Sequence, residues 1–457
     1  MQLTTRFILV ACLSARFALA QATPPEPPGN TRRGVASPPV DDAAFTPDPS
    51  PAPADRVADP AATLVPPPAA EEDVFAELER ELSEPHANSA APAATAAPLR
   101  PFPGGYRGAQ SMNPDLALIA DFAAAWFSDS DHQQSGGHDP TRTGFNLQGL
   151  ELNARSVVDP YLRFDASVVF AEEEVEIEEV YATSLALPGG LQARFGQFLT
   201  RFGRINPTHP HAWDFSDQPF AIGRAFGGEG NRGLGLELSW LLPLPWYVEL
   251  VGSATEASGA GSNRSFRGES ELGVEGPGDL LGVVAVKQFF DLDRDWSLLW
   301  GVSGAFGPGP TDREHRSAVY GTDLYLKYRP LVGADSTVVT WQTEVLHRRR
   351  QIGGQLLWDS GGYSQINVRF ARRWSSGIRY ELGTPAYDLG AHVADDPLDP
   401  EWTRTRHRGS AALTHHPTEF SRFRLQGSRD TGGAAEGIWA VFLAAELVVG
   451  AHGAHSF

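Results

Sequence analysis

The chain has 457 residues, a net charge of −19 at pH 7, 41% hydrophobic residues and a single cysteine, Cys12. A mean hydropathy of −0.26 excludes a bundle of transmembrane helices, and a pI near 5.1 with scattered arginines excludes an electrostatic surface for nucleic acid. Because Cys12 lies near the start, the rest of the chain has neither a disulfide framework nor a cysteine metal cluster.

Residues 1–20 predict a signal peptide and therefore export. Arg6 precedes an apolar run, and Ala18, Leu19 and Ala20 form the small-x-small pattern that signal peptidase recognises. A lipoprotein box ending at Cys12 is the alternative, but the apolar run before it is short. Residues 21–105 are rich in proline and alanine, with 19 of the 36 prolines in residues 21–103. Such a segment cannot bury enough apolar surface to fold, so we expect a disordered arm in the periplasm.

Residues 106–457 carry the folded part, in which apolar residues recur with a period of two. Ile366, Val368 and Phe370 share one parity, while Arg369 and Arg373 lie on the other. A soluble β-sandwich alternates in the same way, so the periodicity by itself leaves both folds open.

The lengths of the connections favour a membrane barrel. Connections after even-numbered strands are short, while those after odd-numbered strands are mostly long: 128–142, 200–230, 257–277, 350–359 and 388–400. This alternation is typical of a transmembrane antiparallel β-barrel with periplasmic turns and extracellular loops. About 16 strands are predicted: 115–127, 143–158, 160–171, 175–186, 190–199, 231–242, 244–256, 278–290, 294–306, 316–330, 335–349, 360–372, 374–387, 401–415, 418–429 and 435–450.

Chain length and aromatic residues agree with this all-β fold. Residues 114–457 give 21.5 residues per strand with its loop, which is enough for tilted membrane strands. The terminal Phe457 resembles the signal by which such barrels engage the barrel assembly machinery. Aromatic residues near strand ends are candidates for interface girdles: Trp240, Trp246, Tyr247, Trp296, Trp300, Trp374 and Trp402.

Several motifs resemble a family of Gram-negative outer-membrane proteins often labelled zinc-regulated TonB-dependent outer membrane receptors. The longest is residues 204–219, RINPTHPHAWDFSDQP. In the same order as in that family stand residues 113–115 (NPD), 158–161 (VDPY), 178–181 (EEVY), 187–190 (LPGG) and 226–229 (FGGE). The resemblance implies an outer-membrane location and expression that responds to zinc.

The length of the chain argues against the receptor part of that label. A TonB-dependent receptor has 22 strands and a folded plug, and 22 strands at 21.5 residues each need about 473 residues before any plug is added. We therefore expect a porin-like barrel.

The charged parity would then face a water-filled lumen, because a 16-stranded barrel is too wide for side chains to fill. Acidic candidates for the pore lining come early in the chain: Glu151, Asp165, Glu174, Glu176 and Glu178. Basic candidates come late: Arg369, Arg373, Arg379, Arg404, Arg406, Arg422 and Arg424. Unlike walls would set an electric field across the channel.

The connection 200–230 follows the fifth strand, where general porins fold a loop inward, and we expect it to form a constriction. It contains His209, His211, Asp214 and Asp217, whose side chains are of the types that bind zinc. The alternative is that the histidines hydrogen-bond to lumen carboxylates such as Glu178. No cofactor is certain, and zinc is the candidate.

The expected function is passive passage of small solutes or ions through a non-enzymatic channel, with a link to zinc as a further expectation. A receptor that binds a metal or metal chelate is the alternative, and a barrel enzyme is a weaker one because no catalytic motif is present. The expected partners are the outer-membrane lipid bilayer and small solutes. A homo-oligomer is left open.

Overall fold

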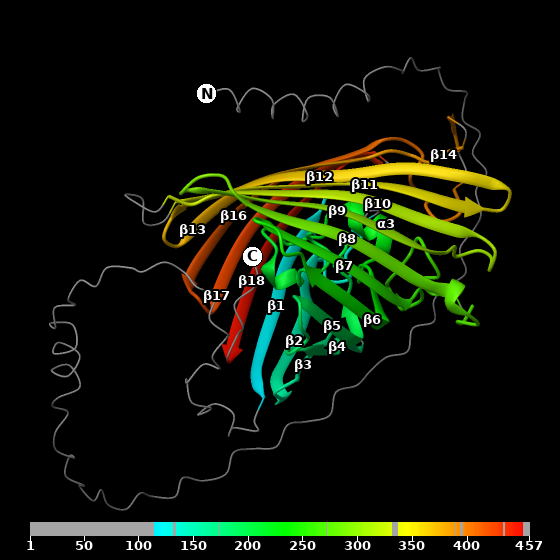
Figure 1. Cartoon of the computed structure of the whole chain (residues 1–457). Helices are drawn as coiled ribbons and strands as arrows, with labels where there is room; N and C mark the ends of the chain where they lie inside the picture. Colours follow the sequence, from blue (N-terminus) through cyan, green and yellow to red (C-terminus); the bar gives the residue numbers. More distant parts are fainter. Residues whose placement is uncertain are drawn as a thin grey trace, which may run out of the picture. The chain divides into compact units, whose positions relative to one another are not determined.

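A closed β-barrel forms the wall of the protein (Figure 1), in a computed structural model that describes residues 114–450 except 131–133, 173, 271, 331–336, 389, 394–395 and 433–434. Neighbouring strands pair antiparallel, and β1 (Asp115–Phe127) pairs with β18 (Ala435–Gly450) to close the ring. Of the 18 strands, β14 (Tyr387–Asp388) and β15 (Ala391–His392) have two residues each, which leaves 16 long strands. The predicted barrel is confirmed.

The remaining long strands are β2 (Gly144–Asp159), β3 (Leu162–Phe170), β4 (Val175–Ser184), β5 (Leu191–Leu199), β6 (Arg232–Leu241), β7 (Tyr247–Glu256), β8 (Leu280–Asp291), β9 (Trp296–Pro308), β10 (Arg316–Tyr328), β11 (Val338–Ile352), β12 (Gln355–Ala371), β13 (Trp374–Gly383), β16 (Arg406–Thr418) and β17 (Ser421–Gly432). The helical segments are η2 (Pro210–Ala212), α3 (Phe220–Phe226) and η3 (Pro277–Asp279). Among the described residues, no helix has the length and apolar character needed to cross a membrane.

The alternating side chains point to opposite sides of the wall, as the period of two predicts. On β13, Ile378 and Tyr380 are exposed, while the intervening Arg379 and Glu381 are buried inside the barrel. The apolar outer face suits lipid, and the charged inner face needs polar partners within the barrel. The predicted signal peptide, the arm at 21–105 and Phe457 lie outside the described residues.

One predicted long connection, 350–359, is wrong. β11 and β12 run on to a two-residue turn, Gly353 and Gly354, with ladder pairs up to Ile352 and Gln355. Gly353 has a φ of 58°, a left-handed conformation that glycine adopts without strain. The alternation continues through Arg348 and Arg350, but these residues are charged, so the apolar pattern that indicates a strand ends before them.

The aromatic residues near strand ends divide into two groups. All of the predicted girdle residues except Trp402 are exposed on the barrel. Trp402 is buried, and its ring packs edge-on against Phe220 with 5.3 Å between centroids. The prediction for Trp402 is wrong because its connection folds into the barrel, where an apolar ring finds other apolar groups.

An apolar cluster occupies part of the barrel interior. Its centre is α3, whose residues are all buried and which lies within the ring of strands in Figure 1. Phe220, Ile222 and Phe226 of α3 belong to one cluster with apolar residues of the inner wall: Leu281, Val283, Ala305, Val319 and Leu346. The helix itself lies against β12 and β13, and the cluster links it to the inner wall of β8 to β11. Burial stabilises this arrangement by about 1.5–3 kcal/mol for each large side chain.

Candidate functional site

Residues 200–231, called the constriction loop here, connect β5 to β6 through the barrel interior. The loop begins on the inner wall at β11, where the Glu344 carboxylate accepts hydrogen bonds from the backbone N–H groups of Arg204 (3.2 Å) and Ile205 (2.8 Å). Pro207 and Pro210 restrict the backbone of the next segment, which contains η2. The loop then forms α3 and continues to β6, and none of its residues is exposed, as we expected of a constriction.

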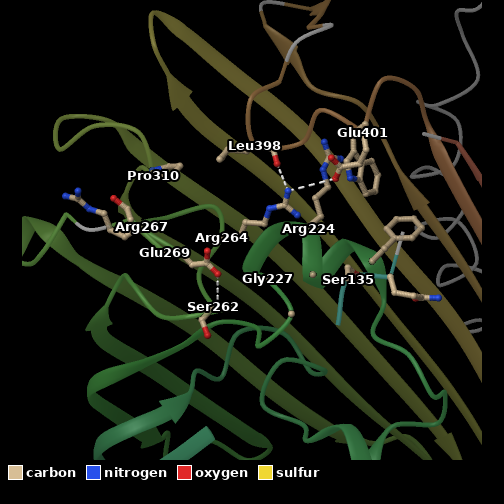
Figure 2. Close-up of a pocket in the computed structure, with 18 of the residues that line it drawn as sticks. Ser135, Arg224, Gly227, Ser262, Arg264, Arg267, Glu269, Pro310, Leu398 and Glu401 are labelled. Carbon is tan, nitrogen blue, oxygen red and sulfur yellow. Dashed lines mark hydrogen bonds and ion pairs between the residues drawn. The ribbon is translucent and has the colours of Figure 1, made fainter. Parts of the chain in front are cut away.

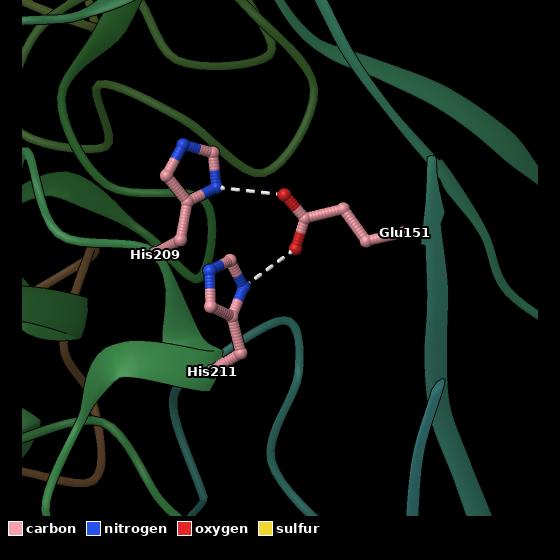
Figure 3. Close-up of side chains that lie close together, drawn as sticks. All are labelled: Glu151, His209 and His211. Atoms are coloured by element: carbon pink, nitrogen blue, oxygen red, sulfur yellow. Dashed lines mark hydrogen bonds and ion pairs between the residues drawn. The ribbon is translucent and has the colours of Figure 1, made fainter. Parts of the chain in front are cut away.

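The constriction loop makes its first contact with the inner face of β2 and β4, which we call the acidic wall, through His209 (Figure 3). The Nδ1 of His209 lies 3.2 Å from Glu151, the contact drawn in Figure 3, and 3.1 Å from Glu178. Its Nε2 lies 2.9 Å from Glu179. The ring of His211 stacks on the ring of His209, and the Nδ1 of His211 lies 2.8 Å from the other carboxylate oxygen of Glu151. We call these five residues the His–Glu cluster.

A β-bulge explains why two consecutive glutamates reach this cluster. In the β3–β4 ladder, Ser167 pairs with Glu179 and Val168 with Ile177, so Glu178 is the extra residue. Glu178 and Glu179 are therefore both buried, although strict alternation would turn one of them to lipid. Sequence reasoning missed Glu179 for this reason, because a bulge depends on the partner strand.

The His–Glu cluster holds His209 as a cation. Burial by itself lowers the pKa of His209, but the charges of Glu178 and Glu151 and their hydrogen bonds outweigh burial and hold that pKa well above its ordinary value. Both ring nitrogens then carry protons, and each one faces a carboxylate. Nearby, burial opposes and Glu229 favours protonation of His138, whose pKa rises to about 10. The imidazolium of His209 thus offsets part of the charge of the three buried carboxylates in the His–Glu cluster.

The second contact is made by Asp217 at the basic wall, the inner face of β13, β16 and β17. Its buried carboxylate accepts hydrogen bonds from Arg379 (2.6 Å), Arg408 (3.0 Å) and Gln426 (2.6 Å). Burial tends to raise the pKa of Asp217, but the charges of Arg379 and Arg408 hold it below its ordinary value. The loop therefore presents a cation to the acidic wall and an anion to the basic wall, and this polarity fixes its orientation across the lumen.

The four predicted zinc ligands do not come together. His209 and His211 face β2 and β4, whereas Asp214 accepts hydrogen bonds from Gln365 (3.3 Å) and Asn367 (2.5 Å) of β12. Asp217 lies at the arginines of β13 and β16, so the predicted set is wrong in its two aspartates. The turn through η2 separates the pairs by sending the two halves of the segment to different walls.

The predicted acidic lining residues have different environments. Glu151 and Glu178 belong to the His–Glu cluster, and the buried Asp165 binds Arg155 and Arg163 on its own wall. Glu176 forms an ion pair with Arg232. Glu174 is exposed in the connection between β3 and β4, outside the strands.

The predicted basic lining residues also fall into two groups. Arg379, Arg406, Arg422 and Arg424 hold partners inside the barrel: Asp217, Asp430, Glu446 and the carbonyl oxygen of Trp213, respectively. Arg369, Arg373 and Arg404 are exposed. Arg408 was missed, although it shares the parity of Arg406 on β16 and that parity could have identified it.

A third polar centre lies at the long-loop end of the barrel and was also missed. Arg348 and Arg350 of β11 are fully buried and bind Asp359 of β12 together with Asp396 and Asp399 from the connection before β16. The Arg348-Arg349-Arg350 run was the available signal, since alternation places its first and third members inward. This centre ties Asp396 and Asp399, and with them the segment 396–402, to the wall.

Comparison with known proteins places the chain among barrel proteins. No family model matches the chain. An uncharacterized protein of Aquifex aeolicus is 31% identical over 389 residues, which cover 75% of this chain and 80% of that protein. The crystal structure of the outer membrane channel DcaP of Acinetobacter baumannii covers 74% of this chain and 97% of its own, with a TM-score of 0.51 and 12% identity.

An anion-selective porin from Comamonas acidovorans is 12% identical, covers 74% of this chain and 99% of its own, and has a TM-score of 0.49. The likeness to DcaP shows that the fold is that of an outer-membrane channel barrel. Neither the Aquifex aeolicus relative nor DcaP supports the label of a zinc-regulated TonB-dependent receptor.

Proposed function

We propose that the chain, which belongs to the same family as the uncharacterized Aquifex aeolicus protein, is a porin-like channel for passive passage of small solutes or ions. The observation that carries this proposal is the constriction loop, which crosses a polar lumen and binds both walls through His209 and Asp217. Such a loop narrows a 16-stranded barrel without the folded plug of a receptor. Its buried ion pairs keep it in one place, as a pore of defined width needs.

The proposed location is the outer membrane, with the arm at 21–105 in the periplasm. The exposed apolar outer face and the aromatic residues at strand ends support a barrel surrounded by lipid. The short connections between strands lie at one end of the barrel, which we assign to the periplasm. The signal peptide and an interaction of Phe457 with the assembly machinery are part of the same proposal.

The test of the channel is conductance in a planar lipid bilayer. The full-length protein, added to one side in potassium chloride, is expected to give stepwise current increases that persist without any energy source. Heat-denatured protein of the same concentration serves as the control for leakage. A silent membrane, despite a folded barrel that migrates differently on gels before and after boiling, would contradict the channel and favour a binding receptor.

Zinc binding stays a prediction. The residues proposed to bind zinc are now Glu151, His209 and His211, whose ligand atoms lie within 4.8 Å of one another. A zinc ion there must displace a proton from His209, so affinity should rise with pH. Calorimetric titration at pH 6 and pH 8 tests this expectation. The His209→Ala, His211→Ala double variant should lose zinc affinity by orders of magnitude, since two of three ligands disappear. Equal heats from wild type and the double variant would exclude the site.

A further inference from the structure

A pocket of about 760 Å³ lies among the long connections at the mouth of the barrel (Figure 2). Its lining comes from α3 and from the loops around residues 134–135, 261–270, 310 and 398–402. Every loop that contributes to it belongs to the long-loop end, which we assign to the cell exterior. A solute entering the proposed channel from outside would meet this pocket before the constriction loop.

The pocket is lined by more cations than anions. Arg224, Arg264, Arg267 and Arg406 line it, against Glu269 and Glu401. The stronger acidic partners of these arginines lie behind the lining: Arg224 and Arg264 each approach Asp399 at 3.0 Å, and Arg267 approaches Asp279 at 3.0 Å. Carboxylates placed there orient the guanidinium groups and leave other N–H groups for a ligand.

Three of those N–H-bearing nitrogens have no hydrogen-bond partner among the described residues. They are Nη2 of Arg224 and both Nε and Nη1 of Arg267. The side chains of Arg224 and Arg267 are only 4% and 2% exposed, respectively. A buried donor without a partner costs about 1–3 kcal/mol, and more on a charged group, so an acceptor in the pocket is favoured once a small side-chain rotation turns one of these nitrogens toward it. The hydroxyl of Ser135, also in the lining, is buried without a partner too.

The remaining lining adds an apolar surface to these donors. Phe220, Trp402, Pro310 and Leu398 all line the pocket, and the Arg224 guanidinium lies 3.9 Å from the centroid of the Trp402 ring. A volume of this size accepts a small organic molecule. The combination of cationic donors and apolar surface suits a solute that has an anionic group on an apolar body.

We propose that this pocket binds small organic anions, through a carboxylate or phosphate group, on their way into the channel. The inference rests on the proposed channel function and adds to it the class of solute. Arg264, labelled in Figure 2, is the arginine best placed to meet the solute first, because its side chain is 37% exposed, whereas those of Arg224, Arg267 and Arg406 are exposed by 4% or less.

The experiment measures block of chloride current through the full-length protein by butyrate, and in a second arm by inorganic phosphate. Each anion is added on the long-loop side of a planar bilayer. Arg264→Gln should raise the half-blocking concentration of the preferred anion about tenfold, which corresponds to about 1.4 kcal/mol. Arg264→Lys, which keeps the charge, should restore part of the block. The two arms distinguish a carboxylate site from a phosphate site.

Two further variants make the result specific to the pocket. Arg142→Gln is the matched control, because Arg142 is 58% exposed at the same end of the barrel and pairs with Glu172, and neither residue lines the pocket. Its half-blocking concentration should equal that of wild type. Glu401→Gln removes a negative charge from the lining and should lower the half-blocking concentration, so it tests the pocket even where Arg264→Gln does not fold.

The outcomes separate the pocket from the channel. Conductance without block by either anion, or equal shifts in Arg264→Gln and Arg142→Gln, would overturn the pocket and leave the channel intact. If no conductance is seen, the channel fails and calorimetry with butyrate and phosphate in detergent decides the pocket. Heat of binding that Arg264→Gln abolishes would then support the pocket, and absence of heat from wild type would overturn it.

Discussion

Substitution of His209 by alanine is expected to lower the free energy of unfolding by about 3–5 kcal/mol. The change leaves Glu151, Glu178 and Glu179 buried together without the imidazolium that all three approach within 3.2 Å. Removal of one partner from a buried ionic cluster is costly because the remaining charges have neither water nor a counter-ion. Urea unfolding of the barrel in detergent with a metal chelator present, followed by tryptophan fluorescence, measures the loss.

The control for His209→Ala is His347→Ala. His347 is an exposed histidine on the outer face of β11, hydrogen-bonded to Ser360 at 2.7 Å. Its loss should change the free energy of unfolding by no more than about 0.5 kcal/mol, as for most surface positions. Equal effects of the two substitutions would contradict the role of the His–Glu cluster as an anchor. Trypsin cleavage within 200–231, increased only in His209→Ala, would locate the change in the constriction loop.

The His–Glu cluster is expected to make the wild-type barrel less stable at alkaline pH. Because the pKa of His209 is raised in the folded state, its stabilisation is complete below the ordinary histidine pKa of about 6.5 and is lost as pH rises through the raised value. His138, with a pKa raised to about 10, contributes to the same slope. Unfolding free energies measured between pH 6 and pH 10 should therefore fall more steeply for wild type than for His209→Ala.

Substitution of Asp217 by asparagine is expected to cost about 3 kcal/mol, near the lower end of the range for a broken buried ion pair. The change keeps the shape of the side chain but leaves Arg379 and Arg408 without the carboxylate that both contact. Glu381 still compensates part of the charge of these arginines, because it lies 2.9 Å from Arg379 and 3.8 Å from Arg408. The measurement is again urea unfolding, together with single-channel current noise, which should increase when the loop loses this contact.

Asp214→Asn is the matched control for this prediction. It removes the same charge from the same loop, but Asp214 accepts its hydrogen bonds from the neutral amides of Gln365 and Asn367. The buried Arg424, which the charge of Asp214 also attracts, keeps Glu446 as a counter-charge. The loss of unfolding free energy in Asp214→Asn should be clearly smaller than that in Asp217→Asn.

The lowered pKa of Asp217 predicts a loss of stability in acid. The stabilisation by Asp217 is present above the unfolded-state pKa near 3.8 and is lost as pH falls through the lower folded-state pKa. A wild-type barrel equally stable at pH 2 and pH 7 would contradict this account.

The sequence by itself determined the wall of the barrel. Alternation is a local property, since neighbouring residues such as Ile378 and Arg379 point to opposite faces whatever the rest of the chain does. Loop lengths determined the type of barrel, and β1 was predicted with both bounds correct. The error at 350–359 arose where charged residues continue the inward parity, because apolar content was used to find the strand ends.

The tertiary structure alone decided the interior. Asp217 meets Arg379 and Arg408 across more than 160 residues of chain, and His209 meets Glu179 across 30, so no local period could pair them. The bulge that turns Glu178 and Glu179 inward depends on the register with β3, not on the sequence of β4. Each buried charge must find a counter-charge somewhere, and only the closed barrel brings the candidates close enough to decide which one.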